Sequence, residues 1–333
     1  MGTLAEMLST PLGVIEWFVY LLAAVMFVIG LHLMNSPKTA RKGNMVSAIG
    51  MVFAVAMAFI VLFAGEASNG FKHGVAVIVL IVGIVIGAVA GVVSAKKVKM
   101  TDMPQLVSVF NTVGGGAAAL VALNDILTSA ETPSIVVLIT AGLGIMIGSV
   151  TFSGSLIAAG KLQGIKWVKK LSLPGKGFWN ILFVVLTIVS FVMLCVQPNQ
   201  RLLWSILTTV FALCYGLVFV IPIGGADMPV VISVLNACTG TAVAMSGLAI
   251  NNIALIVAGA LVGAAGVTLS IAMSKAMNRP LLSVLAGGFG GRRRGAGGHH
   301  EGNLRRRSGR PARLRREGHL RAGLRSGPGP GPA

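Results

Sequence analysis

The residue with the most demanding chemistry in this sequence is Asn236, an amide in the middle of a long apolar run. The centre of a bilayer contains no water that could satisfy an amide, so such a residue needs a hydrogen-bond partner, a pore or a mechanism. A carboxylate, Asp227, stands at the mouth of the same run. It could also cap the N-terminus of a helix that has Pro229 in its first turn. Both a structural and a functional role of Asp227 are therefore open.

The other polar residues at membrane depth are uncharged. A proton pump or ion transporter usually places a carboxylate, His or Lys near the bilayer centre, whereas Glu16 and Asp125 lie near the ends of their apolar runs. The residues that remain at depth are amides and hydroxyls: Asn111, Ser153, Ser155, Ser233, Asn236, Thr239, Thr241 and Ser270. Amides do not change protonation state in the working pH range. Asn111 and Asn236 therefore either join helices by hydrogen bonds or line a wet path that orients water for proton transfer.

The composition excludes a soluble globular protein. Hydrophobic residues make up 55% of the 333 residues and charged residues 11%, an apolar fraction that a globular surface cannot hide. The net charge of +18 suggests a nucleic-acid binder, but 12 of the 27 basic residues, all Arg, lie between Arg292 and Arg325. Cys195, Cys214 and Cys238 stand at wide spacing inside apolar runs, which indicates neither a disulfide frame nor a metal site. We predict an all-α integral membrane protein that binds no nucleic acid or metal and has no catalytic residue of its own.

Nine apolar runs are long enough to cross about 30 Å of hydrocarbon as helices that rise about 1.5 Å per residue. They cover residues 12–34, 45–65, 74–95, 105–126, 134–160, 178–196, 202–222, 229–250 and 254–274. The sequence therefore predicts a bundle of nine transmembrane helices.

The loop charges predict the orientation of this bundle. Thirteen basic residues fall in the loops on one side, and two, Lys72 and Arg201, fall on the other. The thirteen are Lys38, Arg41, Lys42, Lys96, Lys97, Lys99, Lys161, Lys166, Lys169, Lys170, Lys176, Lys275 and Arg279. Because basic loops stay in the cytoplasm, we expect the N-terminus outside and the C-terminus in the cytoplasm.

Small residues predict where helices approach one another closely. Glycines recur every fourth residue in three runs, at Gly83, Gly87 and Gly91, at Gly144 and Gly148, and at Gly259 and Gly263. Three consecutive glycines, residues 114–116, interrupt the fourth run and weaken a helix by about 1 kcal/mol each relative to Ala. We interpret the stripes as packing surfaces and the triplet as a packing or hinge position.

Three long segments carry a family resemblance. The first is MPQLVSVFNTVGGGAAALVALNDIL from Met103, and the second is GSVTFSGSLIAAGKLQG from Gly148. The third pairs ADMPVVISVLNACTG with AMNRPLLSVLAGGFG around the last two runs. These segments resemble the membrane part of the beta subunit of proton-translocating NAD(P) transhydrogenases. The resemblance covers residues 1–290 and includes the nine helices and the outside-to-inside course.

The resemblance implies a function and a set of partners. Members of the family couple inward proton flow to hydride transfer from NADH to NADP. NAD(H) binds to the alpha subunit, and NADP(H) binds to a soluble third domain that follows the beta-subunit helices. The implied partners are the transhydrogenase alpha subunits, a second copy of the complex in a dimer, and the lipid bilayer. The implied location is the bacterial cytoplasmic (inner) membrane.

The resemblance also implies roles for single residues. Asn236 matches the polar residue of the eighth span implicated in the proton path. Asp227 matches the acidic residue at the cytoplasmic mouth, which relays the membrane state to the NADP domain. Gly266 and Arg279 match positions in and after the last span that are tied to this coupling. The candidate residues for the proton path or coupling are Asn111, Ser153, Asp227, Asn236, Gly266 and Arg279.

Asn111 departs from the family pattern, because many members carry a His in the fourth span. Some members with split alpha chains are similar in this respect and place the titrating His on a small partner membrane subunit. An imidazole is the side chain best suited to change its protonation near neutral pH. The resemblance therefore implies that a small alpha-type membrane subunit supplies the titrating His.

The segment after Gly290 does not continue the resemblance. The family continues into a Rossmann-like domain, whereas residues 291–333 are rich in Arg, Gly and Pro and lack residues that could build a core. They contain no strand, glycine turn and helix for a nucleotide. We predict two regions, a transmembrane proton-translocating domain of residues 1–290 and a disordered basic tail of residues 291–333. No cofactor is expected to bind this chain.

A frameshift is our hypothesis for the tail. Read one nucleotide later with permitted codons, residues 318–331 can give VIFAPGYGLAPAQA, which resembles the opening strand and glycine turn of an NADP domain. The alternative is a native basic tail that binds anionic lipid or nucleic acid. The DNA sequence across Gly290 distinguishes the two.

Three functions remain to be weighed from the sequence. The first is a membrane subunit of transhydrogenase that couples proton flow to hydride transfer but, without an NADP domain, transfers no hydride alone. The second is a secondary transporter or channel for a small solute whose glycine-rich helices bind it at mid-membrane. A scaffold without transport is the third. The absence of a charge at depth and of an internal repeat counts against the transporter.

Overall fold

The computed structural model describes residues 10–34, 36–64, 70–129, 133–166, 168 and 175–288. All regular elements in these ranges are helices, and nine of them are long and apolar enough to cross a bilayer. The predicted all-α bundle of nine transmembrane helices is thus confirmed for the described residues. The basic tail, residues 291–333, lies outside them. The orientation expected from the loop charges stays a prediction.

The nine long helices follow the predicted runs and extend past most of them. They are α2 (Pro11–Met34), α3 (Ala40–Ala64), α4 (Gly70–Lys97), α5 (Met103–Thr128), α6 (Ile135–Leu162), α8 (Lys176–Val196), α9 (Arg201–Val220), α10 (Met228–Ala249) and α11 (Ile253–Ala276). The helix α3 begins five residues before its apolar run, so that Arg41 and Lys42 belong to its first turns. Lys and Arg are good helix formers, and hydropathy marks only the apolar part of such a helix.

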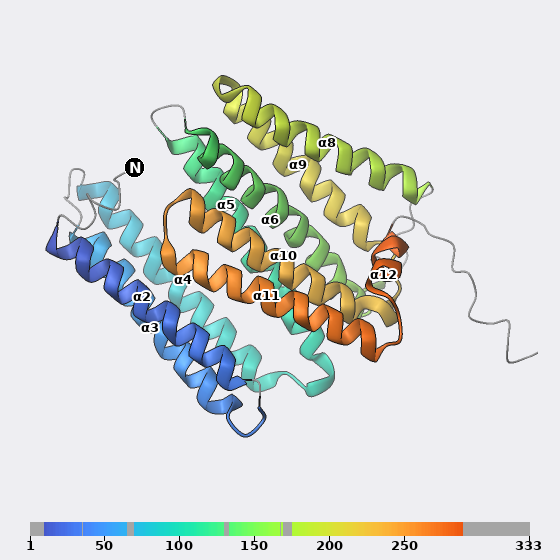
Figure 1. Cartoon of the computed structure of the whole chain (residues 1–333), viewed down its shortest axis with the longest axis horizontal. Helices are drawn as coiled ribbons and strands as arrows, with labels where there is room; N and C mark the ends of the chain where they lie inside the picture. Colours follow the sequence, from blue (N-terminus) through green and yellow to red (C-terminus); the bar gives the residue numbers. More distant parts are fainter. Residues whose placement is uncertain are drawn as a thin grey trace, which may run out of the picture. The chain divides into compact units, whose positions relative to one another are not determined.

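Four helices, α5, α6, α10 and α11, form the centre of the bundle (Figure 1). The helix α10 packs against the other three, and α5 packs against α6. Glycines allow this approach: a Cβ added at Gly148 would lie 2.7 Å from the carbonyl oxygen of Gly115. One added at Gly116 would lie 2.7 Å from Cδ2 of Phe152. The glycine triplet of α5 is therefore a packing surface inside a continuous helix, as one of its two predicted roles required.

Two asparagines make the tight turn between α10 and α11. Asn251 adopts a left-handed conformation (φ 55°), and the N–H of Asn252 donates to the carbonyl of Gly247 at 2.9 Å. This is the pattern of a Schellman motif, which ends a helix with satisfied carbonyls. The side-chain oxygen of Asn252 then accepts the N–H of Leu255 at 3.1 Å and caps α11. The pair thus ends one helix and starts the next.

The outer helices lie on both sides of the centre. The pair α2 and α3 packs beside α11, and the pair α8 and α9 packs beside α6. The helix α4 has the highest mean hydropathy of the nine, and its most apolar stretch contains no buried residue. No atom lies within 4 Å of a Cβ placed at Gly83, Gly87 or Gly91. No described part of the chain therefore packs on this predicted stripe, whereas the other two stripes do pack.

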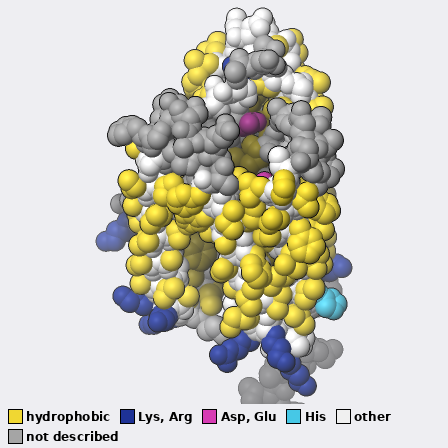
Figure 2. All heavy atoms as spheres, turned by 90° about the vertical axis from the view of Figure 1, so that its left-hand side faces the viewer, with side chains coloured by type: hydrophobic (Ala, Val, Ile, Leu, Met, Phe, Trp, Pro, Cys, Tyr) yellow, Lys and Arg dark blue, Asp and Glu magenta, His cyan; other side chains and the backbone are white. Residues whose placement is uncertain are grey.

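One end of the bundle carries most of the basic residues, and we call it the lysine-rich end. Lys97, Lys161 and Lys275 lie there, at the ends of α4, α6 and α11. Figure 2 shows Lys and Arg side chains gathered toward one end of a broad hydrophobic surface. A short helix that the sequence did not predict, α12 (Leu281–Gly288), lies at this end and buries Val284. Its eight residues are too few to register as a membrane run.

Candidate functional site

The amide of Asn111 is buried where α5 crosses α10. The residue is 5% exposed, and its Nδ2 donates to the carbonyl oxygen of Ile232 at 3.4 Å. Ile232 precedes Asn236 by four residues, so its carbonyl also accepts the N–H of Asn236 within α10. The structure thus brings Asn111 within one helical turn of Asn236, as either interpretation of the two amides requires.

Asn236 lies on the side of α10 that faces α5. Residues 232, 236 and 239 share one helical face, and both ends of this face touch α5, because a Cβ added at Gly114 would lie 3.2 Å from Cγ2 of Thr239. Asn236 is partly buried, and its side chain makes no hydrogen bond to the residues that the structure describes. The crossing therefore presents one amide that is bonded to the facing helix and one amide that is open to a further partner.

Gly266 holds α11 directly against the backbone next to Asn236. A Cβ added there would lie 2.6 Å from the backbone nitrogen of Ala237. The Gly266 carbonyl accepts the hydroxyls of Ser233 at 3.2 Å and Ser270 at 2.8 Å, and the two hydroxyl oxygens lie 3.0 Å apart. This buried group fixes the register of the two helices at the level of Asn236. Gly266 acts through close packing and offers no side chain for proton transfer.

Asp227 and Arg279 form an ion pair at the lysine-rich end. One guanidinium nitrogen of Arg279 donates to both carboxylate oxygens, at 2.8 and 2.9 Å. The Asp227 side chain is 12% exposed and that of Arg279 is 47% exposed. Asp227 precedes α10, and Pro229 lies in the first turn as expected, but the carboxylate makes no capping hydrogen bond. The ion pair, rather than a helix cap, is the role that the structure gives to Asp227.

The end of α11 explains the position of Arg279. Asn278 is left-handed (φ 51°), and the N–H of Arg279 donates to the carbonyl of Ser274 at 3.1 Å. Pro280 follows and cannot continue the helix. The turn directs the chain back toward the start of α10, and the ion pair links the end of α11 to that start.

Ser153 lies apart from the two asparagines. It is 3% exposed, and its hydroxyl donates to the carbonyls of Ser149 at 3.1 Å and Val150 at 3.4 Å in its own helix. It points toward Gly216 of α9, where an added Cβ would collide with its oxygen. The structure thus places Ser153 at the contact of α6 with α9, not at the crossing of α5 with α10.

Several polar contacts were missed by the sequence reasoning. The hydroxyl of Ser108 donates to the carbonyl of Ser155 at 2.8 Å, and that of Ser246 donates to the carbonyl of Ala118 at 2.9 Å. Both serines lie within apolar runs, which was the available signal. The side-chain oxygens of Gln105 and Ser155 are buried without a partner among the described residues. Buried polar atoms of this kind are normally bonded to protein or ordered water, so this half of α5 suits a hydrated path.

Lys161 was counted only as a loop charge, but it joins two helices. Its ammonium group donates to three carbonyls at the end of α9, those of Val220 at 3.1 Å, Ile223 at 2.9 Å and Ile221. A cation is favourable there because the last carbonyls of a helix lack partners and carry partial negative charge. Lys161 therefore fixes the turn that leads to Asp227.

The arrangement can orient water and hold helices in register, but it contains no obvious proton carrier. The groups at the crossing of α5 with α10 are amides and hydroxyls, which keep their protonation state in the working pH range. No group of three His, Cys, Asp or Glu residues that could hold a metal occurs in the part of the chain that the structure describes.

Comparisons with known proteins agree with the resemblance of the sequence segments. The family model for the NAD(P) transhydrogenase beta subunit matches residues 16–313. The NAD(P) transhydrogenase subunit beta of Rhodospirillum rubrum is 39% identical over 278 residues, which are 81% of this chain and 57% of the relative. The same values hold for the subunit from the strain ATCC 11170 of that species. The chain thus spans little more than half the length of these relatives.

Proposed function

The chain belongs to the NAD(P) transhydrogenase beta-subunit family, and from this membership we propose that it couples proton flow across the membrane to hydride transfer from NADH to NADP. Family membership and nine membrane-length helices make it a multi-pass membrane protein, and a bacterial cell holds such a helical protein in the inner membrane. The coupling is assigned to the contacts of α10 with α5 and α11.

The observation that carries the proposal is the position of Asn111 within one helical turn of Asn236. Asn111 is bonded to α10 one turn before Asn236, which is partly buried. A buried amide that is fixed and a second one that is open can orient a short chain of water molecules. Since neither amide titrates, the proton carrier comes from outside this chain. A His on a small alpha-type membrane subunit suits this role.

The ion pair of Asp227 with Arg279 supports a relay at the lysine-rich end. It connects the two ends of the α10–α11 hairpin, which also carries Asn236 and Gly266. A change of charge or hydration near Asn236 would shift α10 against α11, and the ion pair would transmit this shift to the NADP-binding domain of the complex. The coupling role of Gly266 is to keep the two helices in contact.

The nucleotides are assigned to other parts of the complex. The described residues are helical and offer no strand, glycine turn and helix for a dinucleotide. We therefore place NAD on the alpha subunit and NADP on a soluble domain outside the described residues. Residues 1–290 are assigned to the membrane domain and 291–333 to a tail that transfers no hydride. We expect the 333-residue chain to retain no NADP(H); tight binding in a calorimetric titration would contradict this assignment.

A chimera tests the proposed function. Residues 1–290 replace the matched region of the Rhodospirillum rubrum subunit, and the product is reconstituted with that organism's alpha subunits in proteoliposomes. We expect hydride transfer from NADH to an NADP analogue to drive proton movement that an acidification-sensitive dye reports. Size-exclusion chromatography also reports whether two complexes associate into a dimer.

Two results would overturn the proposal. One is hydride transfer at the normal rate without any proton movement in a fully assembled chimera. The other is uptake of a solute by the chain alone, in vesicles without alpha subunits, which is the behaviour of a secondary transporter.

A further inference from the structure

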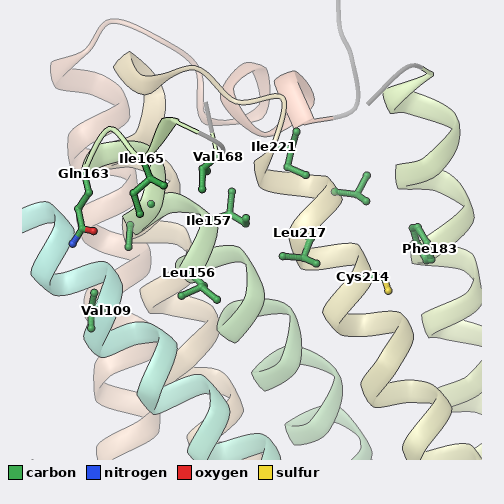
Figure 3. A pocket seen from close by; sticks show the side chains of 13 residues that line it. Val109, Leu156, Ile157, Gln163, Ile165, Val168, Phe183, Cys214, Leu217 and Ile221 are labelled. Atoms are coloured by element: carbon green, nitrogen blue, oxygen red, sulfur yellow. The ribbon is translucent and has the colours of Figure 1, made fainter. Parts of the chain in front are cut away.

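A cavity of about 630 Å³ opens between α5, α6, α8 and α9 at the lysine-rich end (Figure 3). Val109 of α5 and Leu156 of α6 line one side, and Phe183 of α8 and Leu217 of α9 line the other. The segment after α6 closes the top with Ile165 and other residues. This volume lies in the range of sites that hold a small molecule or a lipid chain.

The lining of the cavity selects a hydrocarbon. Apart from the Gln163 amide and the Cys214 thiol, the side chains that line it are apolar. Gln163 is exposed, at the rim. A polar solute or a nucleotide needs several convergent polar groups to replace its hydration. The cavity offers one amide at its rim and a weak thiol donor, so a saturated chain fits its chemistry better than a polar molecule.

The cavity is open toward the surroundings of the bundle. Leu156 is 53% exposed and Val109 is 38% exposed, although both belong to membrane-length helices. An opening at this depth faces the hydrocarbon of the bilayer, so the chains of membrane lipids can enter it sideways.

An exposed lysine, Lys166, directly follows the lining residue Ile165. The ammonium group of Lys161, in contrast, already donates to three main-chain carbonyls after α9. Lysines near a membrane surface attract anionic headgroups by roughly 1 kcal/mol each. The rim therefore complements a phosphate-bearing headgroup, and the interior complements its acyl chain.

We propose that this cavity binds one acyl chain of an anionic phospholipid, with the headgroup phosphate next to Lys166. The lipid comes from the leaflet at the lysine-rich end, which the loop charges predict to be cytoplasmic. Its acyl chain fills the space between α8 and the α6–α9 contact, so that α8 is held to the bundle partly through lipid.

Photo-crosslinking of the unmodified chain tests the proposal. The chain is reconstituted in phosphatidylcholine vesicles that contain a phosphatidylglycerol with a diazirine in its acyl chain, and labelled peptides are mapped by mass spectrometry. We expect more labelling at Leu156 and Leu217 than at Leu269. Leu269 is an exposed leucine in the half of α11 that is nearer the lysine-rich end. Equal labelling at the three leucines would overturn the proposal.

Two pairs of variants sharpen the test. Leu217→Trp fills the cavity, and we expect it to reduce labelling of Leu156 by about tenfold, whereas Leu269→Trp leaves it unchanged. Lys166→Gln is expected to reduce the preference for phosphatidylglycerol over a phosphatidylcholine probe by about fivefold, and the matched Lys97→Gln is expected to leave it unchanged.

Equal labelling by both probes in the unmodified chain would overturn the assignment of an anionic lipid. Loss of the label when the alpha subunits are added would assign the cavity to a partner helix instead.

Discussion

The helices α11 and α4 carry the same glycine pattern and behave differently. Glycines at spacing four occur at Gly259 and Gly263 in α11 and at Gly83, Gly87 and Gly91 in α4. In α11 they meet the small residues Gly240, Thr241 and Ala244 of α10, whereas no atom of the described residues lies within 4 Å of a Cβ added to those of α4. A stripe of small residues thus produces a helix contact only where a facing helix presents small residues of its own.

Hydropathy and burial also distinguish the α10–α11 contact from α4. The helix α10 has the lowest mean hydropathy of the nine long helices and is the most buried, while α4 has the highest and is the least buried. Polar side chains are tolerated at membrane depth where protein surrounds them and where backbone carbonyls accept their protons. The candidate residues Asn111 and Asn236 lie in the two least apolar of the nine long helices, α5 and α10.

The largest expected effect comes from a substitution in α11 that tests the difference between its glycines and those of α4. A Cβ at Gly259 would collide with the backbone nitrogen of Ala244 and lie 2.7 Å from the carbonyl of Gly240, and backbone atoms cannot move aside. We expect Gly259→Leu to lower the free energy of unfolding by more than about 3 kcal/mol. Unfolding in an SDS gradient, followed by circular dichroism, measures it.

Gly87→Leu is the matched control on α4, where no described atom lies within 4 Å of an added Cβ. We expect a change within about 0.5 kcal/mol. Similar losses in the two variants would show that the α4 stripe also packs within this chain.

The second prediction compares two lysines at the same end of the bundle. Lys161→Met removes an ammonium group that satisfies three carbonyls after α9. Because hydrogen bonds to charged groups contribute more than neutral ones, we expect a loss of about 2 kcal/mol in the free energy of unfolding. The exposed Lys166→Met should change it by less than about 0.5 kcal/mol. Equal effects of the two would show that the α9 carbonyls do not depend on Lys161.

The helices were predictable from the sequence and their partners were not. Runs of apolar residues determine spans locally, so nine helices could be identified. The acceptor for Asn111 is a main-chain carbonyl 121 residues later, and that for Lys161 is the end of a helix about 60 residues later. A main-chain carbonyl carries no residue-specific signal, so only the packed structure shows which one is near. The ion pair of Asp227 with Arg279 was within reach, since both were candidate residues, but their pairing was not stated.

The third prediction concerns that ion pair. A double-mutant cycle with Asp227→Asn and Arg279→Gln should give a coupling energy of about 1 kcal/mol in the free energy of unfolding. The value is modest because half of the Arg279 side chain is exposed. Lys275→Gln, combined with Asp227→Asn, serves as the control and should give no coupling. A coupling near zero for Arg279 would mean that the two charges are separated in the bilayer.

The smallest expected effect on stability concerns the amide of Asn111. Asn111→Leu keeps the size of the side chain and removes one long hydrogen bond to α10. Hydrogen bonds between membrane helices contribute about 0.6 kcal/mol on average, so we expect a loss of that order in the free energy of unfolding. A loss above about 2 kcal/mol would assign Asn111 to structure rather than to a wet path.

The central claim is that the proton path runs at the crossing of α5 with α10. The most direct test introduces Asn236→Leu into the reconstituted chimera and measures the number of protons moved per hydride transferred. The side chain of Asn236 has no described partner, so this variant is expected to fold normally. We expect it to move fewer than about a tenth as many protons per hydride as the unmodified chimera, while Gly87→Leu moves the normal number. Normal proton movement in the Asn236→Leu chimera would contradict the assignment of the proton path to the crossing of α5 with α10.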